Sequence, residues 1–143
     1  MKPAVLGISN AIFSFTGYSV QMRNILLGLK KRGYRAANLG WYGLEGGMLE
    51  WNGIPIYPGS GGVFGVNVMG GDAKHFKADM ILTLQDIWAL PPDYRERAGG
   101  TPVALYFPVD TTPVAERNVE MASTADWPIV YSRFGLREME DAG

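Results

Sequence analysis

Apolar and polar residues alternate along the chain in short blocks that predict strands and helices in turn. Apolar runs predict strands at 4–8, 34–40, 54–57, 80–84, 103–107 and 128–131. Segments with helical periodicity or helix-favouring composition separate most of these runs. This alternation predicts an α/β fold with a doubly wound, mostly parallel sheet and helices on both faces.

The first such unit is a strand at 4–8, a loop at 9–17 and an amphipathic helix that stops at Gly33. Either Ser14 or Thr16 can cap the helix, and its apolar residues share one face: Tyr18, Met22, Ile25, Leu26 and Leu29. A helix N-terminus directs unpaired N–H groups at an anion. The loop is therefore either a ligand site or an ordinary connection, and the G-x-G-x-x-G dinucleotide fingerprint is absent.

Shorter helices are predicted at 66–76, 92–97, 114–124 and 136–142. In the third of these we expect Val114, Val119 and Ala122 to face inward. The segment 48–58 alternates around an Asn-Gly pair, which predicts a small hairpin or a short edge strand. Pro55 is expected only at a sheet edge because it has no N–H to donate.

Polar side chains follow two of the predicted strands. Gln85 and Asp86 come directly after the strand at 80–84, and Asp110 follows the strand at 103–107. In open α/β sheets ligands bind at the carboxyl ends of the strands, so these residues are candidates for a binding site. A competing interpretation is that Asp86 caps the helical turn before Pro91.

The amino-acid composition disfavours or excludes several classes of function. The 143 residues are about the size of one domain, and 47% apolar with 19% charged residues indicates a globular protein. A net charge of −1 disfavours nucleic acid as a partner. With no cysteine and only His75, neither a disulfide framework nor a multi-histidine zinc site is available. His75 itself is either a surface or helix-end residue or a catalytic base.

No apolar run approaches the 18 residues of a membrane span, and no signal-peptide pattern opens the sequence. We therefore expect a cytoplasmic protein. Many aromatic residues fall in predicted loops, where they could stack on sugars, bury against another domain or form a homodimer face: Phe13, Phe15, Trp41, Trp51, Phe64 and Trp88.

The last thirteen residues, YSRFGLREMEDAG, resemble the V-S-x-F-G-x-x-x-L-x-x-A-G segment that closes the N-terminal domain of group 1 retaining glycosyltransferases of the GT-B fold. Other segments are similar to that family too. Residues 16–19 and 26–34 look like its first loop, its L-x-x-x-L-x-x-x-G-H-x-V helix and its second strand. Residues 78–86 resemble its D-V-V-H-x-H-D strand, and 106–110 the strand after it.

This resemblance implies a Rossmann-like, acceptor-side domain of a nucleotide-sugar-dependent hexosyltransferase. It places Thr16, Gly17 and Tyr18 near the donor diphosphate. The acceptor, a molecule with a free hydroxyl, is implied to lie near Gln85, Asp86, Trp88 and Asp110. Asp110 and Asp86 are the candidate catalytic residues, with no metal and no cofactor besides the nucleotide-sugar co-substrate.

Three departures from the family pattern stand out. Thr16-Gly17 replaces paired glycines, and Phe107-Pro108-Val109-Asp110 replaces a segment that often carries a histidine. The family's C-terminal nucleotide-sugar-binding domain, with its Arg/Lys pair and E-x₇-E motif, has no counterpart in residues 1–143. One helix N-terminus supplies only part of the charge that a leaving diphosphate needs. We therefore expect these residues, as a single domain, to be nearly inactive alone.

Two other function classes are weighed beside this one. A stand-alone, flavodoxin-like binding or interaction module without catalysis fits the same pattern, and a stable homodimer in solution would favour it. A metal-dependent hydrolase built on Asp86 and Asp110 is the weaker alternative, because the sequence suggests no further ligands for the metal.

Overall fold

The chain forms a single sheet with helices on both sides. The computed structural model describes residues 2–143, with Val63 described by its backbone alone. Its strands are β1 (Ala4–Asn10), β2 (Arg35–Tyr42), β3 (Leu49–Trp51), β4 (Ile54–Pro58), β5 (Met80–Leu84), β6 (Val103–Phe107) and β7 (Trp127–Val130). The helices are α1 (Gly17–Lys31), α2 (Met69–Phe76), α3 (Tyr94–Arg97), α4 (Glu116–Ser123) and α5 (Arg133–Ala142), with short 3₁₀ turns η1 (Val63–Gly65) and η2 (Ile87–Ala89).

The sheet has the order β3-β4-β2-β1-β5-β6-β7, and every neighbouring pair is parallel except β3 with β4. The chain runs outward from β1 in one direction through β2 and β4, then returns to β5 on the other side of β1. The order of strands therefore reverses between β1 and β5. The predicted α/β fold, with a doubly wound and mostly parallel sheet, is confirmed, and it is consistent with a Rossmann-like architecture.

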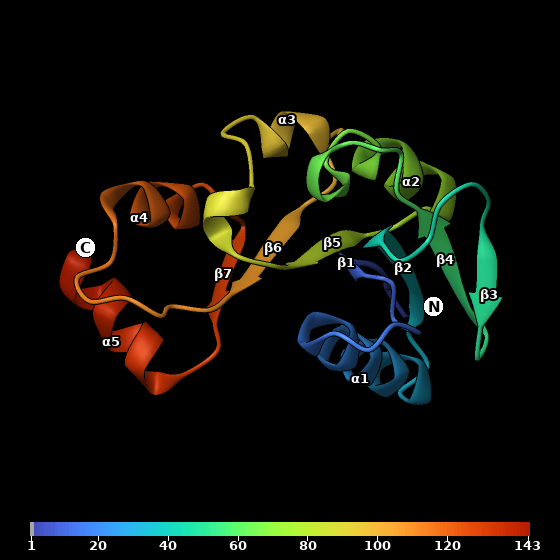
Figure 1. The fold of residues 1–143 in the computed structure, drawn as a ribbon, viewed down its shortest axis with the longest axis horizontal. Helices are drawn as coiled ribbons and strands as arrows, with labels where there is room; N and C mark the ends of the chain where they lie inside the picture. The colour runs from blue at the N-terminus through green and yellow to red at the C-terminus, as the bar shows by residue number, and fades with distance from the viewer. Residues whose placement is uncertain (1) are drawn as a thin grey trace.

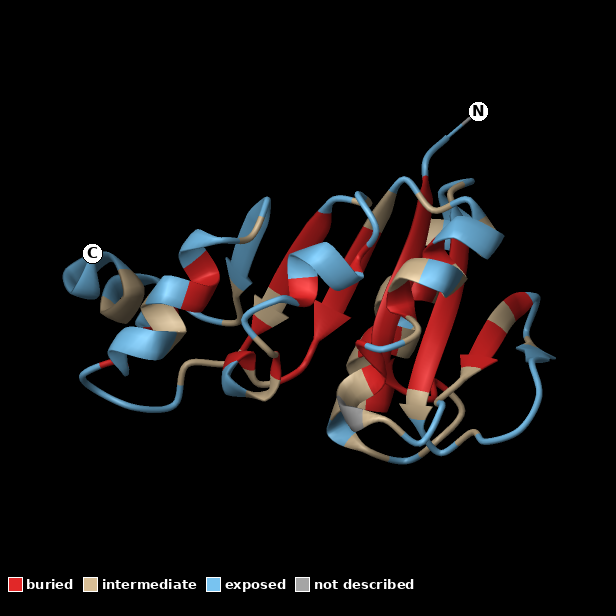
Figure 2. Cartoon of the chain, turned by 90° about the horizontal axis from the view of Figure 1, so that it is seen from above, coloured by how far each residue is buried: buried red, intermediate tan, exposed pale blue. Residues whose placement is uncertain are grey.

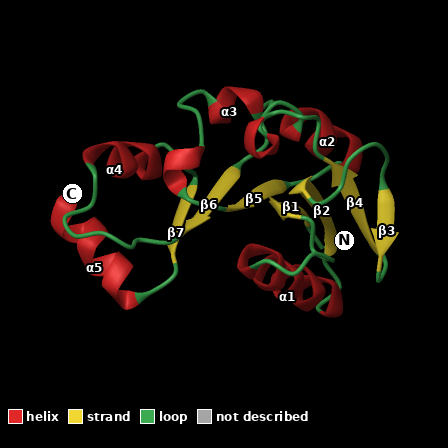
Figure 3. Ribbon diagram, in the orientation of Figure 1, coloured by secondary structure: helices red, strands yellow, loops and turns green. Residues whose placement is uncertain are grey.

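Two helical layers enclose the sheet. Helix α1 covers one face, while α2, α3 and α4 cover the other (Figures 1 and 3). We call these the α1 face and the α4 face. Alternate residues of β1 divide between them: Val5 packs with Met22 and Leu26 of α1, whereas Leu6 and Ile8 pack in the core under α2, α3 and α4. Figure 2 shows the buried strands between mostly exposed helices.

Helix α1 follows its sequence signals closely. Thr16 is the N-cap, and its side chain accepts a hydrogen bond from the Ser19 N–H. Gly33, at φ 85°, ends the helix as predicted, because glycine takes left-handed backbone values without a Cβ penalty. Met22 and Leu26 are fully buried, and Gly7 of β1 leaves the space that the Met22 sulfur fills.

The shorter elements depart from the predicted bounds. Helix α5 begins at Arg133 and not at 136, because the Ser132 side chain accepts the Gly135 N–H and starts the helix earlier. Helix α4 begins at Glu116, so Val114 is buried but lies before the helix. Met121 and Ala122 are its buried residues, while Val119 is only partly covered.

The predicted hairpin forms as β3 and β4, but the expectation that Pro55 lies only at an edge is wrong. Pro55 is in β4, the second strand from the edge, opposite Glu50 of β3. Pairing between β4 and β2 begins at Ile56, so Pro55 falls outside that ladder and its missing N–H breaks no bond there.

The far edge of the sheet is the most exposed part of the core layer. On β7, Trp127 is 51% and Ile129 42% exposed. Their partners across the strand pair are Ala104 and Tyr106 of β6, on the α1 face. Within residues 2–143, none of the helices has the length and apolar character needed to cross a membrane.

Candidate functional site

Two buried amide side chains lie at the ends of β1 and β5, where the strand order reverses. Ile8 of β1 is opposite Thr83 of β5, and Asn10 and Gln85 each follow this last paired position by two residues. Asn10 is 8% exposed and Gln85 only 2%. The Asn10 Oδ1 atom and both polar atoms of the Gln85 amide have no hydrogen-bond partner. A buried polar group without a partner costs about 1–3 kcal/mol, so such groups are expected where a ligand or ordered water binds.

Asn10 also connects this pair to the N-terminus of α1. Its Nδ2 donates to Thr16 Oγ1 over 2.7 Å. Thr16 Oγ1 accepts the Ser19 N–H at 3.1 Å, and the Thr16 carbonyl accepts the Val20 N–H at 3.1 Å. The capping residue thus occupies the N–H groups of Ser19 and Val20. The N–H groups of Gly17 and Tyr18, the first two residues of the helix, are the ones that α1 leaves for another partner.

The loop that carries this N-terminus is held in place by β2. Asn38 accepts the Ile12 N–H at 3.1 Å and donates to the Gly7 carbonyl at 3.0 Å. The Ala11 N–H donates to the Tyr42 carbonyl at 2.7 Å. A Cβ on Gly40 would lie 2.7 Å from the Ala11 Cα, so the loop approaches β2 more closely than a side chain allows. The geometry of the α1 N-terminus is therefore fixed by backbone contacts.

Next to α1 lies a group of acids and phenols, Tyr18, Asp86, Asp110 and Tyr131, which we call the acid–tyrosine cluster. Burial, hydrogen bonding to Asp86 and the charges of Asp86 and Asp110 raise the pKa of Tyr18 to about 12, with burial the largest cause. Burial and the neighbouring Tyr18, Tyr106 and Asp86 raise the pKa of Tyr131. Tyr131 packs on Tyr106 with ring centroids 4.4 Å apart. Both Tyr18 and Tyr131 are therefore protonated at neutral pH. The Tyr131 hydroxyl is buried without a hydrogen-bond partner.

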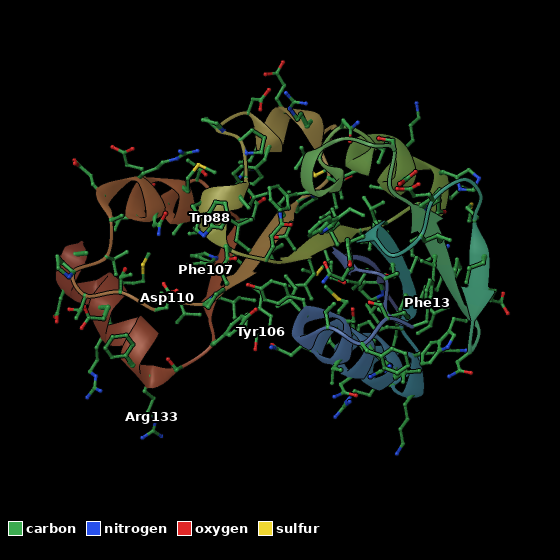
Figure 4. The ribbon with its side chains drawn as sticks, viewed as in Figure 1. Phe13, Trp88, Tyr106, Phe107, Asp110 and Arg133 are labelled. Carbon is green, nitrogen blue, oxygen red and sulfur yellow. The ribbon has the colours of Figure 1, made fainter. Side chains whose placement is uncertain are left out.

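The structure separates Trp88 from this cluster. Asp86 is extended, at φ −61° and ψ 132°, and interacts with Tyr18 on the α1 face. Ile87 packs into the core of the opposite face, and Trp88 lies above the sheet on that side, whereas Tyr106 lies below it (Figure 4). Asp86 occupies the N-cap position of η2, as the cap interpretation expects, but its side chain makes no capping hydrogen bond there.

His75 lies at the other end of the sheet. It is in the last turn of α2, which leads into the start of β5, so it is near the amino end of that strand. Its Nδ1 is 2.7 Å from the Tyr57 hydroxyl. The interpretation of His75 as a helix-end residue describes its position, and it takes no part in the acid–tyrosine cluster.

Sequence reasoning missed Asn10, Tyr131, Arg97 and Arg117. Asn10 carried a usable signal, since a polar residue at the end of a buried β-run is the counterpart of Gln85 on the next strand. Arg97 and Arg117 line a pocket beside Trp88, but they come from two helices that are 20 positions apart in the chain. Only the tertiary packing brings them together.

Among residues 2–143, no group of three or more His, Asp or Glu side chains is arranged to hold a metal ion. No protein-family model matches the sequence, and no curated protein matches it at a significant level. The functional argument therefore depends on the site itself.

Proposed function

We propose that the chain is the acceptor-side domain of a nucleotide-sugar-dependent retaining glycosyltransferase of the GT-B fold. The observation that carries the proposal is a set of buried amide atoms without partners at the ends of β1 and β5, where the strand order reverses: Asn10 Oδ1 and both polar atoms of the Gln85 amide. Ligands of open α/β sheets bind at that point. Through its Nδ2, Asn10 is also bonded to Thr16 at the N-terminus of α1. The resemblance of residues 131–143 to the segment that closes such domains supports the same assignment.

On the donor side, the N–H groups of Gly17 and Tyr18 would bind oxygens of the donor diphosphate. Helix α1 is 15 residues long, so its N-terminus carries the partial positive charge of a full macrodipole. Gly17 has no heavy atom of a neighbour within 4 Å of its ideal Cβ position. A phosphate can therefore approach the backbone there closely.

On the acceptor side, Asp86 and Asp110 would accept hydrogen bonds from hydroxyl groups of the acceptor. The Tyr18 phenol lies close enough to Asp86 for the carboxylate to raise the pKa of Tyr18. An acceptor hydroxyl that replaces this phenol would be held beside a group able to take its proton when the glycosidic bond forms. This arrangement makes Asp86 and Asp110 the proposed catalytic pair, with Gln85 beneath them in the buried layer.

The proposed domain has low activity by itself. Departure of a nucleoside diphosphate requires strong neutralisation of its charge, and one helix N-terminus contributes about half an elementary charge. We propose that a second domain supplies the remaining cations, that the reaction uses no metal or further cofactor, and that it takes place in the cytoplasm.

The proposal can be tested by NMR titration of the ¹⁵N-labelled chain with pyrophosphate. The backbone amide signals of Gly17 and Tyr18 are expected to shift saturably. Asn10→Asp places a negative charge next to the capping residue Thr16 and should weaken the response at least tenfold. Asn24→Asp makes the same charge change at an exposed position of α1 and should leave the response to pyrophosphate unchanged. No response at Gly17, or an equal loss in both variants, would contradict the proposal.

A stand-alone interaction module is the second candidate, and the exposed apolar residues at the β7 edge favour it. Trp127 and Ile129 on β7 and Phe134 and Leu136 on α5 are between 41% and 51% exposed. Analytical sedimentation of the wild-type chain and of Ile129→Lys measures the oligomeric state, which distinguishes the interaction module from the glycosyltransferase domain. A stable dimer that Ile129→Lys dissociates, together with no response to pyrophosphate, would favour the module.

A further inference from the structure

A pocket on the α4 face lies beyond the acid–tyrosine cluster. It has a volume of about 330 Å³ and is formed where η1, η2, α3 and α4 meet. We call it the basic pocket, and the lining residues that matter here are Asn67, Trp88, Leu90, Arg97 and Arg117. Small-molecule sites range from about 300 to 1,000 Å³, so this volume suits a ligand the size of one sugar ring.

The charged residues of the basic pocket are all positive. Arg97 and Arg117 line it and no acidic residue does. Arg97 is partly neutralised, because its Nε is 2.9 Å from Asp93 Oδ2. Among the described residues, Arg117 has no carboxylate within ion-pair distance. Arg117 is therefore the cation left to bind an anion.

Helix α4 keeps its acids away from this pocket. Glu116 and Glu120 line a different hollow, which α4 forms with α5. Arg117 lies on the other side of the helix, toward Trp88 and Leu90. The helix thus presents opposite charges on two sides, and the basic pocket faces the positive one. Such a pocket favours an anionic ligand over a neutral one.

The apolar side of the basic pocket can accommodate a sugar ring. Trp88 is 58% exposed, and its ring is held edge-on by Phe64, with centroids 6.4 Å apart. Phe64 in turn packs on Trp41 at 4.9 Å. Asn67, on the opposite wall, is oriented by a 2.6 Å hydrogen bond to Ser60. A supported aromatic face with an amide and a guanidinium nearby can stack on a sugar ring and bind its polar groups.

We propose that the basic pocket binds a sugar or cyclic polyol that carries a phosphate or carboxylate, with Arg117 on the anionic group and Trp88 on the ring. This inference goes beyond the proposed function. The basic pocket lies on the α4 face, whereas Asp86 interacts with Tyr18 on the α1 face, so the pocket is a second ligand site.

The test is calorimetric and NMR titration of the intact chain with glucose 6-phosphate, glucose and inorganic phosphate. Glucose 6-phosphate is expected to bind more tightly than either other compound and to shift the Trp88 indole signal, assigned with Trp88→Phe. Arg117→Gln should weaken this binding at least tenfold, and Arg117→Lys should retain part of it because the point charge remains.

Arg133→Gln is the matched control. It removes the same charge at the start of α5, where Arg133 points away from the sheet (Figure 4), and should leave the affinity unchanged. Thermal melting of Arg117→Gln checks that this variant folds. An equal loss in both variants, no preference for glucose 6-phosphate over glucose, or a response at Gly17 in place of Trp88 would overturn the inference.

The two proposals fail in different ways. A pyrophosphate response at Gly17 without glucose 6-phosphate binding removes the basic pocket and leaves the proposed domain function. Glucose 6-phosphate binding at Trp88 without the pyrophosphate response supports an anion pocket and contradicts the donor site.

Discussion

The acid–tyrosine cluster and the basic pocket lie on opposite faces of the sheet and have opposite chemistry. The first gathers two carboxylates and two protonated phenols near α1, and the second gathers two arginines and an exposed tryptophan near α4. Residues 86–88 contribute to both, because Asp86 is extended and interacts with Tyr18, whereas the 3₁₀ turn η2 begins at Ile87 and carries Trp88 into the basic pocket. A few residues after one strand can thus serve two sites of different charge.

The two sites also differ in the contacts that hold their residues in place. The α1 N-terminus is fixed by close backbone contacts with β2, such as Gly40 on Ala11. The basic pocket is held from α3, where the Tyr94 hydroxyl lies 2.9 Å from Thr124 Oγ1 and Arg95 pairs with Asp126. Each site can therefore be disturbed without the other.

The largest effect is expected from Gly40→Ala. Its new methyl group would meet the Ala11 Cα at 2.7 Å, so the loop before α1 must move, at a cost of about 1–3 kcal/mol in the free energy of unfolding. Urea denaturation measures this loss. The variant should also lose the pyrophosphate response at Gly17 while it keeps glucose 6-phosphate binding at Trp88.

Gly71→Ala is the control, because its Cβ would meet nothing within 4 Å and it lies in a helix. We expect it to be neutral or slightly stabilising. Equal losses of stability in both variants would mean that the close approach of Gly40 does not fix the loop.

A smaller effect is expected from Asp126→Asn, which disturbs the support of the basic pocket. The Asp126 carboxylate accepts the Val103 N–H at 2.8 Å and pairs with Arg95 at 3.0 Å. These two interactions, the backbone bond first, lower the pKa of Asp126. The stabilisation is therefore present above the unfolded-state pKa of about 3.9 and is lost as the pH falls through the lower folded-state value.

Thermal melting from pH 2 to 7 checks this. The variant should melt below the wild type at pH 7, and the two should converge under acidic conditions. Asp141→Asn, at an exposed site on α5, should follow the wild type throughout. A constant gap at every pH would assign the loss to packing and not to the charge.

The smallest effect is expected from Asp86→Asn, which should change the pKa of Tyr18 and leave the fold intact. It removes a hydrogen bond and a negative charge that raise the pKa of Tyr18, but burial remains the largest cause. The pKa of Tyr18 should fall below about 12 and stay above the ordinary value near 10. NMR titration of ¹³C-tyrosine-labelled protein measures it, and Asp93→Asn, near the basic pocket, should leave it unchanged.

Several elements of the molecule follow from local sequence signals. The apolar face of α1, its stop at Gly33 and the buried run of β5 are each visible in a window of a few residues. The start of α5 was misplaced because Ser132 caps the helix three residues before the apolar pattern begins. Pro55 was misplaced because which strand forms the edge depends on pairing between distant segments.

The alternation of strands and helices and the polar residues after β5 and β6 can be predicted from the sequence, because each depends on the order of neighbours along the chain. Three arrangements arise only in the folded chain: Asn10 is bonded to Thr16, Asp86 interacts with Tyr18, and Trp88 joins Arg97 and Arg117 on the other face. These pairings depend on strand register and on which face each helix covers. Both are set by the packing of the whole core and not by any local window.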